Sequence, residues 1–118
     1  MATKTTSYAA ILGQILQARR KERGLEQKVF AELLHISQAT LSRIENGQLT
    51  LSVPQLIQAA EVLEINPNDI MKDIADITQH LRQENVAVLD KDTGKDNTKT
   101  FLAGAALGAL LLLLLSRK

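Results

Sequence analysis

Residues 27–47 read QKVFAELLHISQATLSRIENG, and this stretch decides the fold. Its apolar residues recur at spacings of three and four, which is typical of amphipathic helices. The segment HIS at 35–37 interrupts the pattern and ends in serine, a preferred N-cap residue. The Asn-Gly pair at 46–47 ends the second run, because glycine readily takes the left-handed backbone found after helices. The stretch therefore predicts two helices, 27–34 and 38–45, joined by a tight turn.

Further helices are predicted on both sides of this pair. Residues 8–23 carry apolar side chains at helical spacing, and the basic residues near their end suit the helix dipole. A fourth helix begins after Ser52, where Gln55 completes a capping-box pattern. A fifth begins at Asn-Pro 66–67, since proline favours the first helical position. The expected fold class is all-α, with a five-helix domain over residues 8–75.

The fifth helix is expected to continue as a helical extension over residues 76–89. Its apolar residues follow spacings of four, three and four, which resembles a heptad seam. They are Ile70, Ile74, Ile77 and Leu81. Two interpretations stay open, a weak dimer contact or an amphipathic face packed on its own domain. The polar, charged residues 90–100 are expected to form a flexible linker.

The C-terminal residues 101–115 read FLAGAALGALLLLLL and carry no charge. With one more residue on each side, they would form a helix of about 25 Å, near the short limit for a hydrocarbon core about 30 Å thick. Cations at 99 and 117–118 can reach the headgroups by snorkelling. We therefore expect a single transmembrane helix over 101–116 with the lipid bilayer as partner. The rival interpretation is a buried oligomerisation helix.

Two further expectations follow for this segment. Gly104 and Gly108 are four residues apart, a spacing that lets two membrane helices approach closely. The expected location is the cytoplasmic face of the bacterial inner membrane, with the N-terminus in the cytoplasm, where DNA is accessible.

The stretch SQATLSRIENG at 37–47 is the most specific part of the sequence. With the residues before it, it resembles the Cro/C1-type (XRE) family of helix-turn-helix DNA-binding proteins. The resemblance covers residues 12–74. It implies a lambda-repressor-like domain of five helices whose partner is double-stranded DNA, and a homodimer is left open.

The same resemblance implies roles for individual residues. Gln27 would bind phosphate and support Gln38, and Asn46 would be another phosphate contact. Arg20 and Glu45 would form a structural ion pair that joins the first helix to the end of the third.

The second helix of the motif is expected to read bases in the major groove. Leu41 and Ile44 face inward, so the opposite face is free to meet DNA. Gln38 can pair with adenine, Arg43 with guanine or phosphate, and Ala39 can touch a thymine methyl group. The expected DNA-binding residues are Gln27, Lys28, Gln38, Ala39, Thr40, Ser42, Arg43 and Asn46.

Three departures from the family pattern stand out. His35 replaces a frequent glycine in the turn, at a position expected to need positive φ. Glu26 replaces the usual serine or threonine cap of the second helix. The loop QLTLSV at 48–53 has no cation, and phosphate contacts dominate affinity, so we expect modest affinity for a monomer.

Basic residues gather in the first half of the chain, although the net charge of the 118 residues is only +1. Residues 1–50 hold seven Lys and Arg residues against four glutamates. The seven are Lys4, Arg19, Arg20, Lys21, Arg23, Lys28 and Arg43. This distribution places any basic surface within the predicted helix-turn-helix domain.

Residues able to carry catalysis are scarce. The sequence has no cysteine, which excludes disulfides and thiolate metal sites. His35 and His80 lie far apart and are expected to be surface or capping residues rather than metal ligands. No Gly-rich phosphate loop or Ser/His/Asp set is evident. We therefore expect no metal site, no cofactor and no enzymatic activity.

Two functions are consistent with these features. The first is a sequence-specific DNA-binding protein, a transcriptional regulator or DNA tether, anchored to the membrane by its C-terminus. The alternative is a membrane-anchored protein-interaction adaptor similar to the bacterial cell-shape protein RodZ. The outward face of helix 38–45 discriminates them, because an adaptor should present a more apolar or acidic patch than Gln38, Ser42 and Arg43 provide.

Overall fold

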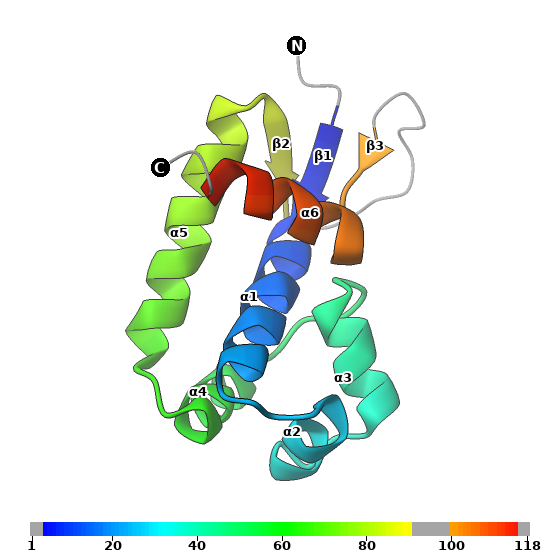
Figure 1. Ribbon diagram of the computed structural model, residues 1–118, viewed down its shortest axis with the longest axis vertical. Helices are drawn as coiled ribbons and strands as arrows, with labels where there is room; N and C mark the ends of the chain where they lie inside the picture. The colour runs from blue at the N-terminus through cyan, green and yellow to red at the C-terminus, as the bar shows by residue number, and fades with distance from the viewer. Residues whose placement is uncertain (1–3, 91–99, 116–118) are drawn as a thin grey trace.

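The structure is a computed structural model that describes residues 4–90 and 100–115. Within these ranges the chain forms six helices and three short strands (Figure 1). In chain order they are β1 (Lys4–Ser7), α1 (Tyr8–Glu22), α2 (Gln27–Leu33), α3 (Gln38–Glu45), α4 (Val53–Leu63), α5 (Pro67–Gln83), β2 (Val86–Leu89), β3 (Thr100–Phe101) and α6 (Gly104–Leu115).

Helix α1 lies at the centre of the molecule (Figure 1). Helices α3, α5 and α6 all pack against it, and α4 packs against α5. The interior between them is aliphatic apart from one aromatic ring. Its largest fully buried apolar side chains are Ile11, Leu16, Phe30, Leu41, Leu63, Ile70, Leu81 and Leu107. Each such side chain contributes about 1.5–3 kcal/mol through removal from water.

The predicted helix starts are confirmed by capping contacts. The Ser7 and Ser37 hydroxyl oxygens accept backbone N–H groups at the starts of α1 and α3. Ser52 and Gln55 form the full capping box of α4. Helix α2 begins after Glu26, whose side chain makes no capping hydrogen bond. This agrees with the replacement of the usual serine or threonine cap by Glu26.

Helix α1 approaches the end of α3 backbone to backbone. A Cβ atom built on Gly13 would lie 2.7 Å from the carbonyl oxygen of Glu45. Gly47, with φ of 80°, would place a Cβ 2.9 Å from that of Ala10. Because side chains would collide at both points, the two glycines fix how closely α3 sits on α1.

The all-α prediction is incomplete, because the chain also forms a three-stranded parallel sheet in the order β2-β1-β3. Lys4 pairs with Val86 on one side of β1 and with Thr100 on the other. The helical extension expected over 76–89 stops at Gln83. Asn85 then takes a left-handed φ of 61°. The following Val-Ala-Val-Leu run suits a strand better than a helix.

The four heptad-spaced residues of α5 face their own domain. Ile70 and Leu81 are buried, and Ile74 and Ile77 are partly buried against the core. This favours the packing interpretation over a dimer seam along these residues. The predicted linker lies largely outside the described residues, since only its two ends, at 90 and 100, are described.

The C-terminal segment also differs from expectation. Helix α6 has 12 residues, and no helix in the described ranges is long and apolar enough to cross a membrane. The transmembrane helix predicted over 101–116 is therefore not supported. Gly104 and Gly108 pack against the domain, because a Cβ on either would lie within 3 Å of the side-chain oxygen of Asn46 or Gln14. In the described structure both glycines lie in contact with the domain.

Candidate nucleic-acid interface

Helices α2 and α3 bury one face each and leave a shared outer face open. Phe30, Ala31 and Leu34 are buried on the α2 side, and Leu41 and Ile44 on the α3 side. The residues predicted to contact DNA lie on or beside the open face. Lys28, Gln38, Ala39, Arg43 and Asn46 are exposed, and Gln27, Thr40 and Ser42 are half-buried.

The turn between the helices has the geometry expected of it. His35 has φ of 58°, in the left-handed region, and its N–H donates to the Glu32 carbonyl oxygen at 3.1 Å. The Ser37 oxygen accepts the backbone N–H of Thr40 at 3.0 Å, and its hydroxyl hydrogen bonds the Thr40 hydroxyl at 2.8 Å. These contacts fix the first turn of α3, which carries Gln38 and Ala39.

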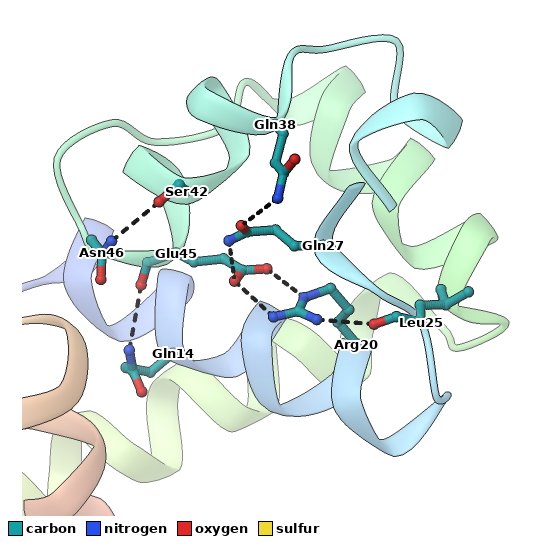
Figure 2. A network of polar contacts seen from close by, with 8 residues as sticks. All are labelled: Gln14, Arg20, Leu25, Gln27, Gln38, Ser42, Glu45 and Asn46. Atoms are coloured by element: carbon teal, nitrogen blue, oxygen red, sulfur yellow. Dashed lines mark hydrogen bonds and ion pairs between the residues drawn. The ribbon is translucent and has the colours of Figure 1, made fainter. Parts of the chain in front are cut away.

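A buried ion pair supports the end of α3 from below (Figure 2). Arg20 donates from Nε to one Glu45 carboxylate oxygen at 2.8 Å and from Nη2 to the other at 3.1 Å. Arg20 also donates to the Leu25 carbonyl oxygen at 2.9 Å. Glu45 is only 1% exposed. Such a bidentate pair has a fixed geometry, and removing one partner strongly destabilises the fold.

The network continues from the ion pair to the surface. Gln27 donates from Nε2 to the Glu45 carboxylate at 3.1 Å. Because a carboxylate only accepts, this contact fixes the Gln27 amide so that its oxygen faces outward. That oxygen accepts Nε2 of Gln38 at 3.4 Å. Figure 2 shows the resulting line of side chains from Arg20 through Glu45 and Gln27 to Gln38.

One residue of this region was missed by the sequence analysis. Gln14, on α1, is 9% exposed and donates to the backbone carbonyl oxygen of Glu45 at 3.4 Å. The available signal was a lone amide within an apolar stretch of α1. This hydrogen bond joins the end of α3 to α1. The next residue along the chain, Asn46, donates to the Ser42 hydroxyl at 3.5 Å.

Three of the basic residues in the first half form ion pairs within the domain, one of them buried. Arg19 bonds Asp73 of α5 at 2.8 Å, and these hydrogen bonds raise the pKa of the Arg19 guanidinium. Arg23 pairs with Glu64 at 2.7 Å, as Arg20 does with Glu45. These arginines therefore link helices, and the cations left on the open face of α2 and α3 are Lys28 and Arg43.

The loop after α3 does not add cations to this face. Leu51 packs against the core, whereas Leu49 is 44% exposed. Phosphate contacts would therefore have to come from α2, α3 and backbone N–H groups.

Comparison with known proteins identifies the same segment. Residues 16–70 match the family model HTH_3, described as helix-turn-helix. The clp gene regulator ClgR from Corynebacterium glutamicum superposes with a TM-score of 0.60 at 24% identity, covering 65% of this chain and 83% of that one. The controller protein C.AhdI of Aeromonas hydrophila gives 0.50 at 27% identity, covering 52% and 94%.

A third solved structure extends the likeness. An HTH_3 family transcriptional regulator from Vibrio cholerae gives a TM-score of 0.52 at 26% identity, covering 62% of this chain and 42% of that one. No curated protein matches the sequence significantly. The residues matched by the family model, 16–70, include α2 and α3.

Proposed function

We propose that this protein binds specific DNA sequences and regulates transcription, because residues 16–70 match the helix-turn-helix family model HTH_3. Helix α3 enters the major groove, and Gln38, Ala39 and Arg43 meet the base edges. The observation that carries the proposal is the line of contacts from the buried Glu45 through Gln27 to the exposed Gln38.

This line of contacts prepares Gln38 for base reading. A free glutamine side chain would lose rotamer entropy on binding, and a side chain already held in place loses less. The hydrogen bond to Gln27 uses one N–H of the Gln38 amide. The rest of the amide is left to bond adenine, which needs both a donor and an acceptor.

The composition of the open face favours DNA over a protein adaptor. Its exposed side chains include two cations, Lys28 and Arg43, and the amide of Gln38. An adaptor surface would be expected to be more apolar or acidic. The relatives support the same direction, since ClgR is named a gene regulator and C.AhdI a restriction-modification controller.

The test is selection of bound sequences from a random DNA pool with the full chain, followed by affinity measurements on the selected site. Gln38→Ala is expected to lose about 1–3 kcal/mol of discrimination at one base position. Arg43→Ala should weaken binding, whereas Lys72→Ala, which removes the same charge from the exposed side of α5, should not.

Two outcomes would overturn the proposal. One is a pool without sequence enrichment. The other is an equal loss of affinity in Arg43→Ala and Lys72→Ala, which would mean that only net charge matters.

A further inference from the structure

Helix α6 is apolar on every side, but over residues 104–112, where side-chain burial is described, the domain covers only one side. All its residues are Gly, Ala or Leu. Leu107 is fully buried and Leu111 nearly so, whereas Leu112 is 72% exposed. The alanines at 105, 106 and 109 are exposed as well. A helix without a polar face is stable where all its sides are covered, so docking on the domain satisfies α6 incompletely.

The domain side of the groove beside α6, here called the α6 seat, exposes both apolar and polar atoms. It consists of Gln14, Gln17, Ala18 and Lys21 of α1 together with Asn46. A groove of about 470 Å³ remains between this seat and α6, and another of about 280 Å³ lies beside Leu111. These grooves are open to solvent and leave part of α6 without protein contact, so the seat holds α6 less firmly than an enclosed core would.

Two glycines make this docking possible. A Cβ on Gly108 would lie 2.6 Å from Oε1 of Gln14, and one on Gly104 would lie 2.8 Å from Oδ1 of Asn46. Any larger side chain at Gly108 therefore has to displace Gln14 or lift α6 from the seat. A substitution at this position therefore acts where α6 meets the domain.

We propose that α6 exchanges between this seat and the surface of an anionic lipid bilayer. A helix of 12 residues is about 18 Å long, which suits entry into one leaflet rather than crossing. In the sequence, the nearest ionisable residues before and after α6 are Lys99 and Arg117, both cations. Cations beside an apolar helix favour anionic headgroups. This proposal does not depend on DNA recognition.

The experiment is flotation of the full chain with vesicles of phosphatidylcholine and phosphatidylglycerol, compared with phosphatidylcholine alone. Wild type should float with the anionic vesicles. Gly108→Leu should raise the partition coefficient about threefold above that of Ala109→Leu, which adds a similar apolar surface on the exposed side of α6. The difference between the two variants isolates the contribution of the seat.

A second variant tests the exposed side of the helix. Leu112→Lys places a charge where lipid would lie and should lower partitioning about tenfold, while circular dichroism shows an unchanged fold. The proposal is overturned if wild type stays with the soluble fractions, or if Gly108→Leu and Ala109→Leu float equally. It is also overturned if Gly108→Leu self-associates without floating, since a second copy would then cover the released helix. DNA binding by the same variants, measured in parallel, separates this result from the proposed function.

Discussion

At the scale of single residues, Glu45 joins the hydrophobic interior to the proposed DNA face. Its carboxylate accepts from Arg20 and Gln27, and its backbone carbonyl oxygen accepts from Gln14. One side chain thus fixes α1, the start of α2 and the end of α3. Structural support and base recognition are consequently separable by substitution at different points of the network.

The first prediction concerns the buried end of this network. Glu45→Ala leaves the Arg20 guanidinium buried without its carboxylate, so the free energy of unfolding should fall by about 3–5 kcal/mol. Urea denaturation followed by circular dichroism measures the change. Glu61→Ala, which removes an exposed glutamate from α4, is the control and should change little. Equal midpoints for Glu45→Ala and wild type would contradict the structural role.

The second prediction concerns the exposed end. Gln27→Ala removes the hydrogen bonds to Gln38 and to the Glu45 carboxylate but leaves the Arg20–Glu45 pair in place. Stability should fall by about 2–3 kcal/mol, because one of the two lost hydrogen bonds goes to a buried carboxylate. Discrimination among DNA sequences should fall by about as much in Gln27→Ala as in Gln38→Ala. If Gln27→Ala discriminates among sequences as well as wild type does, the hydrogen bond between Gln27 and Gln38 has no part in recognition.

At the scale of elements, the start of α3 and its closeness to α1 set the geometry of the interface. Ser37 caps the turn that carries Gln38, and Gly13 lets α1 touch the far end of the same helix. Helix α3 is therefore positioned at both ends by contacts outside its own DNA-facing side.

The third prediction compares two helix caps. Ser37→Ala and Ser52→Ala each remove an N-cap, from α3 and α4, and each should cost about 1 kcal/mol of stability. Only Ser37→Ala should also weaken DNA binding, because it frays the turn that carries Gln38. A matching loss of affinity in Ser52→Ala would show that lowered stability alone explains the effect.

The fourth prediction reverses a general rule. Replacing a glycine inside a helix with alanine normally raises the free energy of unfolding by about 1 kcal/mol. Gly13→Ala should instead destabilise the domain, because the new methyl group would meet the backbone at Ile44 and Glu45. Thermal melting decides the sign. Ala75→Gly, at an exposed position of α5, shows the ordinary propensity effect. A rise in melting temperature for Gly13→Ala would contradict the close approach.

At the scale of the whole molecule, features that depend on local signals could be predicted from the sequence, and features that depend on long-range contacts could not. The starts of α1, α3, α4 and α5 were predictable because caps such as Ser37 and Asn66 act within a few residues. The strands were not, since a four-residue strand paired across most of the chain leaves no local period. The role of Gln14 was hidden for the same reason, as its partner is 31 positions away.

The C-terminal segment shows a different limit. Its run of leucines indicates an apolar environment but does not distinguish the interior of a protein from a lipid bilayer. In the structure part of that surrounding is the domain itself, through Leu107 and Leu111. Burial by protein and burial by lipid require the same residue types, so composition cannot distinguish them.

The fifth prediction belongs to this scale. Thr6 is buried and its hydroxyl donates to the Leu102 carbonyl oxygen at 2.7 Å, which holds the chain just before α6. Thr6→Val should speed hydrogen exchange in α6 while affinity for the selected DNA site stays at the wild-type value. Unchanged protection of α6 would mean that its docking does not depend on β1. A lower affinity of Thr6→Val for the selected DNA site would mean that the two regions are coupled.

The pairing of β1 with β3 also has a consequence for the order of events during synthesis. The Thr6 and Leu102 partners are 96 positions apart, and their contact forms only after residue 102 has left the ribosome. The helix-turn-helix, built from neighbours in sequence, can assemble well before that moment. Newly made α6 thus emerges when β1, the strand that anchors it, already belongs to a folded domain. A nearby membrane or chaperone has its first opportunity to capture the leucines in that interval.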